Sequence, residues 1–313
     1  MEKQKKALAE VQLEKLSECP VCKGSDFAAS LTCKDYTYSQ VDFGLVDCKS
    51  CGFKFTNPRP TASTIGNYYQ SEDYVSHSDT QEGLVNKLYH LVRTYTLQKK
   101  LQLIFKLRGR VKKQGKTTLL DIGCGTGAFL STCVKAGFEG RGIEPDTNAR
   151  AFAQNNYGLQ VDEEAALELF SAGQFDVISL WHVLEHVPDL DSRMKKIKHL
   201  LAERGHLIIA VPNCDSYDAN YYGKFWAAYD VPRHLYHFTP ATLAELAKRH
   251  QFKLEQVLPM VFDSFYVSML SEQYKNGKSN FIGAIWRGFL SNLKAIKTGK
   301  QYSSQIYILR HES

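Results

Sequence analysis

The chain has 313 residues, of which 43% are hydrophobic and 23% charged, with a formal net charge of +6. This length can bury a large core and the composition is ordinary for a globular protein, so we expect one large domain with a small accessory module. The longest apolar runs, such as Leu207–Val211, are far shorter than the roughly 20 residues of a membrane helix, which predicts no membrane span. Basic residues are scattered rather than clustered, so no dedicated nucleic-acid partner is expected.

Residues 1–16 are expected to form an N-terminal helix or tail. They mix Glu with Lys and lack an apolar stretch, which argues against a secretory signal or transit peptide. A cytoplasmic location is therefore the expectation. In that reducing compartment, the eight cysteines favour metal binding over disulfides.

A small β module is predicted over residues 17–60, where cysteines, glycines and aromatic residues alternate with short apolar stretches. Its two Cys-x-x-Cys pairs are separated by a spacer of about 25 residues, a pattern typical of a structural zinc ribbon. The predicted zinc ligands are Cys19, Cys22, Cys48 and Cys51. Four thiolates close the coordination sphere, so no zinc catalysis is expected. The alternative is a reduced, metal-free module with buried thiols, and Cys33 is not expected to be a ligand.

Residues 61–115 are predicted to be a helical connector that contributes to a substrate site. Between Gly83 and Val111, apolar residues recur at helical spacing, which indicates one or two amphipathic helices. The residues that carry this pattern are Leu84, Leu88, Leu91, Val92 and Tyr95.

Residues 116–313 are predicted to form an α/β core. Short apolar runs alternate with helical segments there, which predicts βαβ units and a parallel, doubly wound, Rossmann-like sheet of seven strands. The runs read as strands are TLLDI, RGIE, FDVISLW, HLIIAVP, FKLEQVLP and YSSQIYILR. Residues 261–301, between strands six and seven, are too many for a hairpin and are expected to form a helical insertion.

A glycine-rich segment follows the first strand of this core. Gly123, Gly125 and Gly127 lie where a strand ends and a helix begins, so backbone amides can approach an anionic group of a ligand. The glycines alone also fit a dinucleotide site. Asp121, two residues before the first glycine, suits a ligand with an ammonium group, and Glu144, at the end of the next strand, is placed to bind ribose hydroxyls.

These residues resemble the class I S-adenosylmethionine-dependent methyltransferases, in the motifs DIGCGTG, GIEPD and FDVISLWHVLEHVPD. The resemblance implies a Rossmann-like methyltransferase sheet and S-adenosylmethionine as cofactor, with residues 161–163 near its adenine. The cofactor-binding residues so predicted are Asp121, Gly123, Cys124, Gly125, Gly127, Glu144, Pro145, Trp181 and His182. Two alternatives stay open: Glu144 as a carboxylate that stabilises a helix start, and Trp181 as part of the core.

A segment after strand five, YDVPRHLYHFTP, holds the candidate groups for acceptor chemistry. The combination of the zinc ribbon with this core resembles the deoxysugar C-methyltransferases that act on keto nucleotide sugars. That resemblance implies His234 as the catalytic base and a contribution from Tyr74 and His77, which have the family's spacing behind the ribbon. The alternative is a turn region with structural aromatic residues.

The motif LEHVPD also resembles the ubiquinone-pathway O-methyltransferases, in which acidic residues and a His hold a divalent ion. Glu185 and His186 match that pattern, so His186 is a further candidate for catalysis. His182 occupies the remaining acidic position, which leaves the use of a catalytic metal open.

The leading hypothesis is methyl transfer to a small-molecule acceptor, such as a sugar or nucleotide sugar. An RNA or protein methyltransferase that docks its substrate through the ribbon, and a non-catalytic cofactor-binding scaffold, are the alternatives. The oligomeric state is left open by the sequence.

Overall fold

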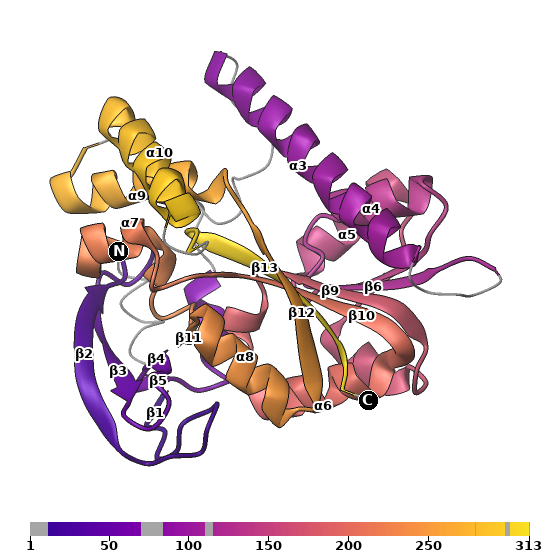
Figure 1. The fold of residues 1–313 in the computed structure, drawn as a ribbon, viewed down its shortest axis with the longest axis horizontal. Coiled ribbons are helices and arrows are strands. Elements are labelled where there is room, and N and C mark those ends of the chain that lie inside the picture. Colours follow the sequence, from indigo (N-terminus) through magenta and orange to yellow (C-terminus); the bar gives the residue numbers. More distant parts are fainter. Residues whose placement is uncertain (1–11, 70–83, 110–114, 279, 298–300, 313) are drawn as a thin grey trace.

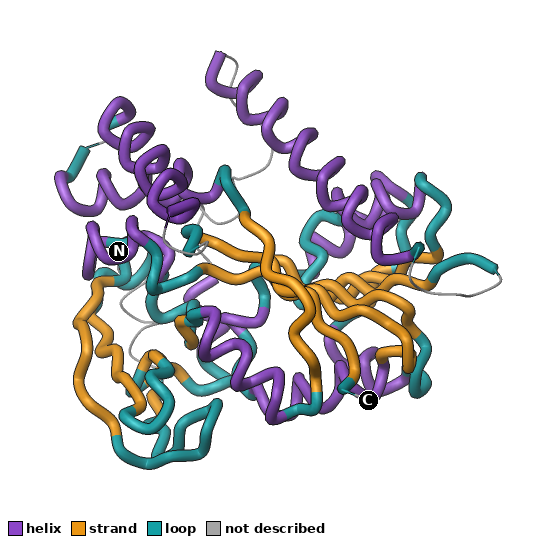
Figure 2. The backbone as a smooth tube through the Cα atoms, in the orientation of Figure 1, coloured by secondary structure: helices purple, strands orange, loops and turns teal. Residues whose placement is uncertain are grey.

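The computed structural model describes residues 12–69, 84–109, 115–278, 280–297 and 301–312. A twisted seven-stranded sheet forms its centre, and a smaller β structure from the N-terminal residues lies beside one end of it (Figure 1). Figure 2 shows helices on both sides of the large sheet. The α/β, Rossmann-like architecture expected from the sequence is confirmed.

The strands of the large sheet follow the order β12-β13-β10-β9-β6-β7-β8. Their bounds are Thr118–Ile122 for β6, Glu139–Ile143 for β7, Val161–Asp162 for β8, Phe175–Trp181 for β9, Leu201–Pro212 for β10, Phe252–Pro259 for β12 and Ser304–His311 for β13. Leu120, Ile178 and Ile209 are fully buried in adjacent strands. Because helices cover both faces, the central strands β6, β9 and β10 contain long buried apolar runs, which the sequence identifies clearly.

The expectation of an all-parallel sheet is wrong for one strand. β13 runs antiparallel to both of its neighbours, β10 and β12. The chain leaves β12 at Pro259, forms the helices α9 (Asp263–Asn276) and α10 (Phe281–Lys297), and enters β13 without a crossover to the opposite edge. A strand that enters from the edge where the previous strand left must run antiparallel to it. The two helices confirm the predicted insertion between strands six and seven.

The remaining helices of the core connect and cover these strands. They are α4 (Ala128–Lys135), α5 (Thr147–Tyr157), η2 (Glu164–Leu169), η3 (Leu184–His186), α6 (Leu190–Leu200), α7 (Tyr217–Tyr222), η4 (Gly223–Phe225), η5 (Ala227–Tyr229) and α8 (Pro240–Arg249). Capping residues explain several of their starts: Asp146, Asp189 and Ser216 each accept a hydrogen bond from the amide three residues on. Such caps satisfy amides that a helix start otherwise leaves without partners.

In the described part of the connector, the chain forms the short η1 (Ile65–Tyr69) and the helix α3 (Leu84–Arg108). Its buried residues, Leu103, Ile104 and Leu107, lie near its C-terminal end. Of the residues in the predicted apolar pattern, Leu91 is 68% and Tyr95 50% exposed. Helical periodicity locates an apolar stripe but does not tell whether another element covers it. The side chains of residues 84–89 lie outside the described part.

The N-terminal residues form a small β structure, as predicted, and one of its strands comes from a distant part of the chain. β2 (Phe27–Lys34), β3 (Asp42–Cys48) and β4 (Lys54–Thr56) form an antiparallel sheet, and β1 (Leu13–Glu14) pairs with β5 (Arg59–Pro60). The fourth strand of the first sheet is β11 (Tyr236–His237), which pairs with β4. β11 belongs to the segment after strand five, so the small sheet continues into the core.

Buried polar contacts reinforce this junction. The Arg233 guanidinium, 1% exposed, pairs with Asp230 and with Asp35 of the small sheet, the latter at 3.5 Å from Nη1 to Oδ1. Thr56 Oγ1 donates a hydrogen bond of 3.0 Å to the carbonyl of His234. Loss of one partner of a buried ion pair strongly destabilises a folded protein, because the other charge stays buried without compensation. These contacts therefore hold the small sheet against the 230–237 segment.

No described helix is both long enough and apolar enough to cross a lipid bilayer.

Candidate active site

The glycine loop between β6 and α4 leaves space for a ligand at one position. Gly123, Gly125 and Gly127 all have positive φ angles, of 68°, 54° and 79°. A Cβ at Gly123 would lie 2.4 Å from Val183 Cγ2, whereas one at Gly125 would meet nothing within 4 Å. The loop is therefore packed against the protein at its start and open at its centre, as close approach of a ligand to the backbone requires.

Asp121 is buried below this loop, at 2% exposure. Its Oδ1 accepts a hydrogen bond of 2.6 Å from Ser179 Oγ on β9. Burial raises the pKa of Asp121 to about 7, while Ser179 and the nearby Lys100 act in the opposite direction. A carboxylate held here gains from any cation that arrives, because the charge is removed from water.

Glu144 and the loop are joined directly. Its Oε2 accepts a hydrogen bond of 2.8 Å from the Gly125 amide, and its Oε1 accepts one of 2.9 Å from the Asp146 amide at the start of α5. Burial raises the pKa of Glu144, and these two amides lower it. The structure thus shows the helix-start contact that the sequence left open, and it places the carboxylate beside the loop. Cys124 and Pro145 flank the two contacts.

Lys100, on α3, is a site residue that the sequence did not identify. Its Nζ lies 4.0 Å from the centre of the Trp181 ring, at the end of β9. Burial lowers the pKa of Lys100, and Asp121 and Asp263 oppose that shift. Trp181 also contacts Phe129, and its Nε1 is buried without a hydrogen-bond partner among the described residues. Nothing in the sequence distinguishes Lys100 from the adjacent Lys99, because only the fold brings one of them to Trp181.

His182 follows Trp181 and lies between two carboxylates. Its Nδ1 is 3.4 Å from Glu185 Oε1 and its Nε2 3.0 Å from Asp263 Oδ2 on α9. Burial alone would lower the pKa of His182, but Asp263 and Glu185 raise it to about 10. Its φ of 57° is unusual for a residue with a side chain. Each ring nitrogen of His182 thus faces a protein carboxylate, and the role of this residue in cofactor binding stays a prediction.

A second cluster contains Glu185, His186 and His234, whose ligand atoms lie within 4.8 Å of one another. His234 Nδ1 donates a hydrogen bond of 2.8 Å to the Ala228 carbonyl. His186 Nδ1 lies 3.1 Å from the Arg233 carbonyl and 2.9 Å from Tyr69 Oη. Since a carbonyl only accepts hydrogen bonds, the neutral His234 ring carries its proton on Nδ1 and leaves Nε2 unprotonated.

The electrostatics of this cluster are those of a neutral imidazole beside a carboxylate. Burial, together with His234, lowers the pKa of His186 to about 4. Burial opposes the charged form of Glu185, but His182 and His234 lower its pKa below the ordinary value. The Glu185 oxygens have no hydrogen-bond partner among the described residues, and His182 faces them at ion-pair distance.

Comparisons with known proteins bear on this arrangement. A family model described as a methyltransferase domain matches residues 89–257, more than half of the chain. The chain belongs to this methyltransferase family. The match includes the glycine loop, Glu144, Trp181 and the Glu185–His186–His234 cluster.

Curated relatives of this methyltransferase include two described as ubiquinone biosynthesis O-methyltransferase. The protein from Cupriavidus pinatubonensis is 28% identical over 158 residues, covering 46% of this chain and 64% of the relative. The protein from Azorhizobium caulinodans is 28% identical over 157 residues, covering 46% and 62%. The matched regions span less than two thirds of these relatives. A solved structure of a SAM-dependent methyltransferase from Archaeoglobus fulgidus is 18% identical, with a TM-score of 0.43 and coverage of 68% of this chain and 93% of that one.

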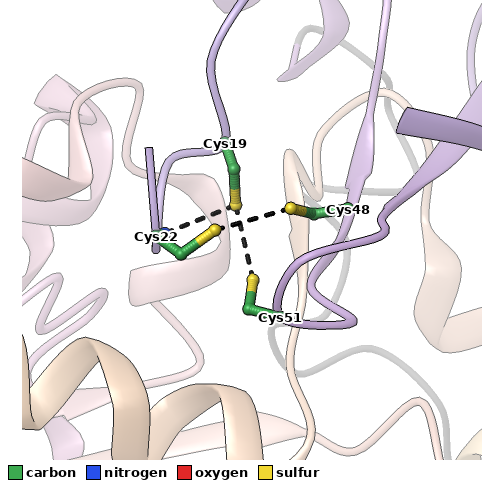
Figure 3. A group of neighbouring side chains, drawn as sticks. All are labelled: Cys19, Cys22, Cys48 and Cys51. Carbon is green, nitrogen blue, oxygen red and sulfur yellow. Dashed lines mark hydrogen bonds between the residues drawn. The ribbon is translucent and has the colours of Figure 1, made fainter. Parts of the chain in front are cut away.

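The methyltransferase also contains the predicted cysteine cluster, in its N-terminal β structure. Figure 3 shows the four sulfurs of Cys19, Cys22, Cys48 and Cys51 pointing toward a common centre. The Cys19 and Cys51 sulfurs are 3.7 Å apart, and those of Cys22 and Cys48 3.5 Å. A tetrahedral zinc ion with ligands at about 2.3 Å requires sulfur separations of about 3.8 Å, so the donor set and spacing fit.

Two of the predicted acceptor-side residues cannot be located. Tyr74 and His77 lie outside the described residues, as does most of the predicted N-terminal tail, residues 1–11. Tyr69, which the sequence did not identify, reaches His186 from the same connector. Its only sequence signal is its position in an aromatic stretch just after the ribbon.

Proposed function

We propose that this methyltransferase moves a methyl group from S-adenosylmethionine to a small-molecule acceptor. The observation that carries the proposal is the joint placement of an open glycine loop, buried Asp121 and Glu144 at neighbouring strand ends, within a matched methyltransferase domain. The cofactor, when bound, supplies a methyl group on a sulfonium. Because this transfer is a displacement at carbon, most of what the protein contributes is alignment of the two reactants.

The residues present fit this cofactor. Asp121 would accept hydrogen bonds from the ammonium of its methionine part, and the open amides around Gly125 and the Lys100 ammonium would bind its carboxylate. Glu144, beside the loop, would give up its hydrogen bond from a backbone amide and accept hydrogen bonds from the ribose hydroxyls instead. Trp181 has a buried donor without a partner, consistent with a ligand on that side.

On the acceptor side, we assign His234 as the base. The Nδ1–H···O bond to Ala228 fixes the tautomer, so Nε2 is available to take a proton from the acceptor. Asp230 Oδ2, 4.0 Å from that Nε2, would stabilise the imidazolium that results. A sugar or nucleotide sugar is our proposed acceptor class, supported by the ribbon and the His234 segment that resemble deoxysugar C-methyltransferases.

The ribbon contacts favour this small-molecule function over docking of RNA or protein. Its strand β4 and its Asp35 are used to hold the 230–237 segment, so a local role accounts for the module.

The pH dependence of cofactor binding tests the role of Asp121. Since its pKa is raised to about 7, the carboxylate is charged above that pH and neutral below it. We expect affinity for S-adenosylhomocysteine, which keeps the ammonium group, to fall by up to about tenfold per pH unit as the pH drops below about 7. Calorimetry across this range measures it.

The matched variant is Asp121→Asn, which keeps the shape and removes the charge. It should weaken binding by about 10- to 100-fold at neutral pH and abolish the pH dependence, because a charge-assisted contact is lost. Equal affinity of the two proteins would refute the assignment.

A second candidate mechanism is supported by one observation, the convergence of Glu185, His186 and His234, each of which offers a ligand atom within 4.8 Å of the others. One carboxylate and two imidazoles suit a divalent transition metal and leave coordination positions open. The ion would be held by these three side chains and would acidify an acceptor hydroxyl. His234 would then be a ligand rather than a base.

Metal removal separates the two mechanisms. If His234 is the base, brief dialysis against EDTA should leave turnover unchanged. The reason is that the tightly held ribbon zinc stays bound during this time and no other metal takes part. If the cluster holds a metal, turnover should fall by at least about tenfold and return with Mg²⁺, Mn²⁺ or Zn²⁺. Metal analysis after dialysis must show that the ribbon zinc is retained.

A further inference from the structure

The helix α10 exposes its large apolar side chains and buries its small residues. Ile282 is 84% exposed, Ile296 66% and Trp286 55%, and these are accompanied by Phe281, Ile285, Phe289 and Leu293. The buried positions are Ala284, Gly288, Ser291 and Ala295. A surface helix of a globular protein normally shows the opposite arrangement.

This orientation is determined by the packing of α10 on α9. A Cβ at Gly288 would lie 2.7 Å from Phe265 Cδ1 and 2.9 Å from Phe265 Cα, so the two helices approach more closely than a larger residue permits. Ser264 Oγ on α9 also donates a hydrogen bond of 3.2 Å to the Gly288 carbonyl. The large apolar residues therefore cannot simply rotate into this interface.

Exposed apolar side chains continue onto the neighbouring helices. Phe262 and Tyr266, at the start of α9, are 37% and 45% exposed. Tyr95 of α3 contacts the Phe262 ring at 5.7 Å, and Leu91 lies one helical turn before it. In Figure 1, α9, α10 and the N-terminal half of α3 project from the same side of the sheet, at the top of the view. We call the exposed apolar residues of these three helices the apolar face.

The charges that border the apolar face are positive. Neither α10 nor α3 contains an Asp or Glu, whereas α10 carries Arg287, Lys294 and Lys297 and α3 carries Arg93, Lys99 and Lys106. The two carboxylates of α9 are turned inward. Asp263 pairs with His182, and Glu272, 5% exposed, accepts a hydrogen bond from Tyr222.

We propose that the apolar face docks on an anionic lipid bilayer. A helix with Trp, Phe and Ile on one side and only cations among its charged residues is the pattern of a segment that lies in the membrane interface. A second copy fits less well, because a two-fold dimer brings the same patch of both chains together and the cationic borders would face each other. Anionic lipid headgroups instead place negative charge opposite these cationic borders.

Vesicle binding of the whole protein tests the proposal. The protein should sediment with vesicles of phosphatidylcholine and phosphatidylglycerol in equal parts, and less with phosphatidylcholine alone, and added salt should weaken the binding. The double variant Ile282→Asp/Ile296→Asp should bind at least about tenfold more weakly, since apolar burial is lost at two positions. Leu169→Asp is the matched control, because Leu169 is 83% exposed on η2, away from these helices, and its binding should be unchanged.

A second measurement, tryptophan fluorescence, does not require a variant that changes the charge of the apolar face. Tryptophan emission of the native protein should shift to the blue with anionic vesicles and be quenched by brominated lipid. Trp286→Phe should still bind and should lose most of the shift, because the other two tryptophans lie away from the apolar face: Trp226 is 2% exposed and Trp181 packs against Phe129 at the end of β9.

Three outcomes would overturn the proposal. The native protein does not bind anionic vesicles even at low salt; the double variant binds as well as the native protein; or light scattering shows a dimer that the double variant abolishes while vesicle binding is absent. The last result would assign the apolar face to a second copy of this chain.

Discussion

Replacing His234 by alanine is expected to lower kcat by about 10²- to 10⁴-fold and leave the Kd for S-adenosylmethionine unchanged, because the variant loses proton removal from the acceptor but not the cofactor contacts. The imidazole is held by the Ala228 carbonyl and lies beside Glu185 and His186. None of these residues belongs to the glycine loop. Turnover is measured with the best acceptor from a screen of nucleotide sugars and simple hydroxyl compounds, and cofactor binding by calorimetry.

Two further variants make this result specific to the Nε2 atom. His234→Asn can keep the hydrogen bond to Ala228 but has no equivalent of Nε2, so it should be as inactive as His234→Ala. His199→Ala, at an exposed position of α6, should keep native turnover. Native activity in either His234 variant would rule out this residue both as base and as metal ligand.

The second large effect is expected at the cysteine cluster. Zinc would contribute about 10–16 kcal/mol to a small module of this kind, so Cys19→Ser together with Cys51→Ser should remove the ion and unfold the ribbon. We expect turnover to fall by at least the factor expected for His234→Ala, while cofactor binding persists. The reason is that β4, Thr56 and Asp35 position the segment that carries His234.

Metal analysis, calorimetry and turnover on the same protein preparation measure these three properties. Cys33→Ala is the matched control, because Cys33 lies in the same sheet but outside the four-sulfur cluster, and it should retain the zinc. A protein that loses its zinc and keeps full turnover would show that the ribbon does not position the active site, and docking of a macromolecule would then be the better explanation for the module.

Several features could be predicted from the sequence because they depend on local patterns. Six of the seven strands could be recognised as runs of the required length, and the methyltransferase family follows from the glycine loop with Asp121 and Glu144. The cysteine spacing predicts the four-sulfur cluster because each knuckle is a local structure. The roles of the individual site residues, the acceptor and the domain boundaries stay predictions.

Long-range contacts could not be predicted in the same way. Nothing in the sequence of α3 separates Lys100, which reaches Trp181, from Lys99, and nothing in HVLEH shows that His182 would lie between Glu185 and Asp263 of the insertion. The direction of β13 depends on where the α9–α10 pair returns the chain to the sheet.

By itself, the sequence determined the type of fold, the family and the candidate ligand groups, because periodicity and motif spacing act within a few turns or strands. Only the tertiary structure decided that β11 joins the small sheet, that His186 and His234 meet Glu185, and that α10 turns its large apolar side chains to solvent. These arrangements depend on which distant surfaces pack together, and that is a property of the whole chain.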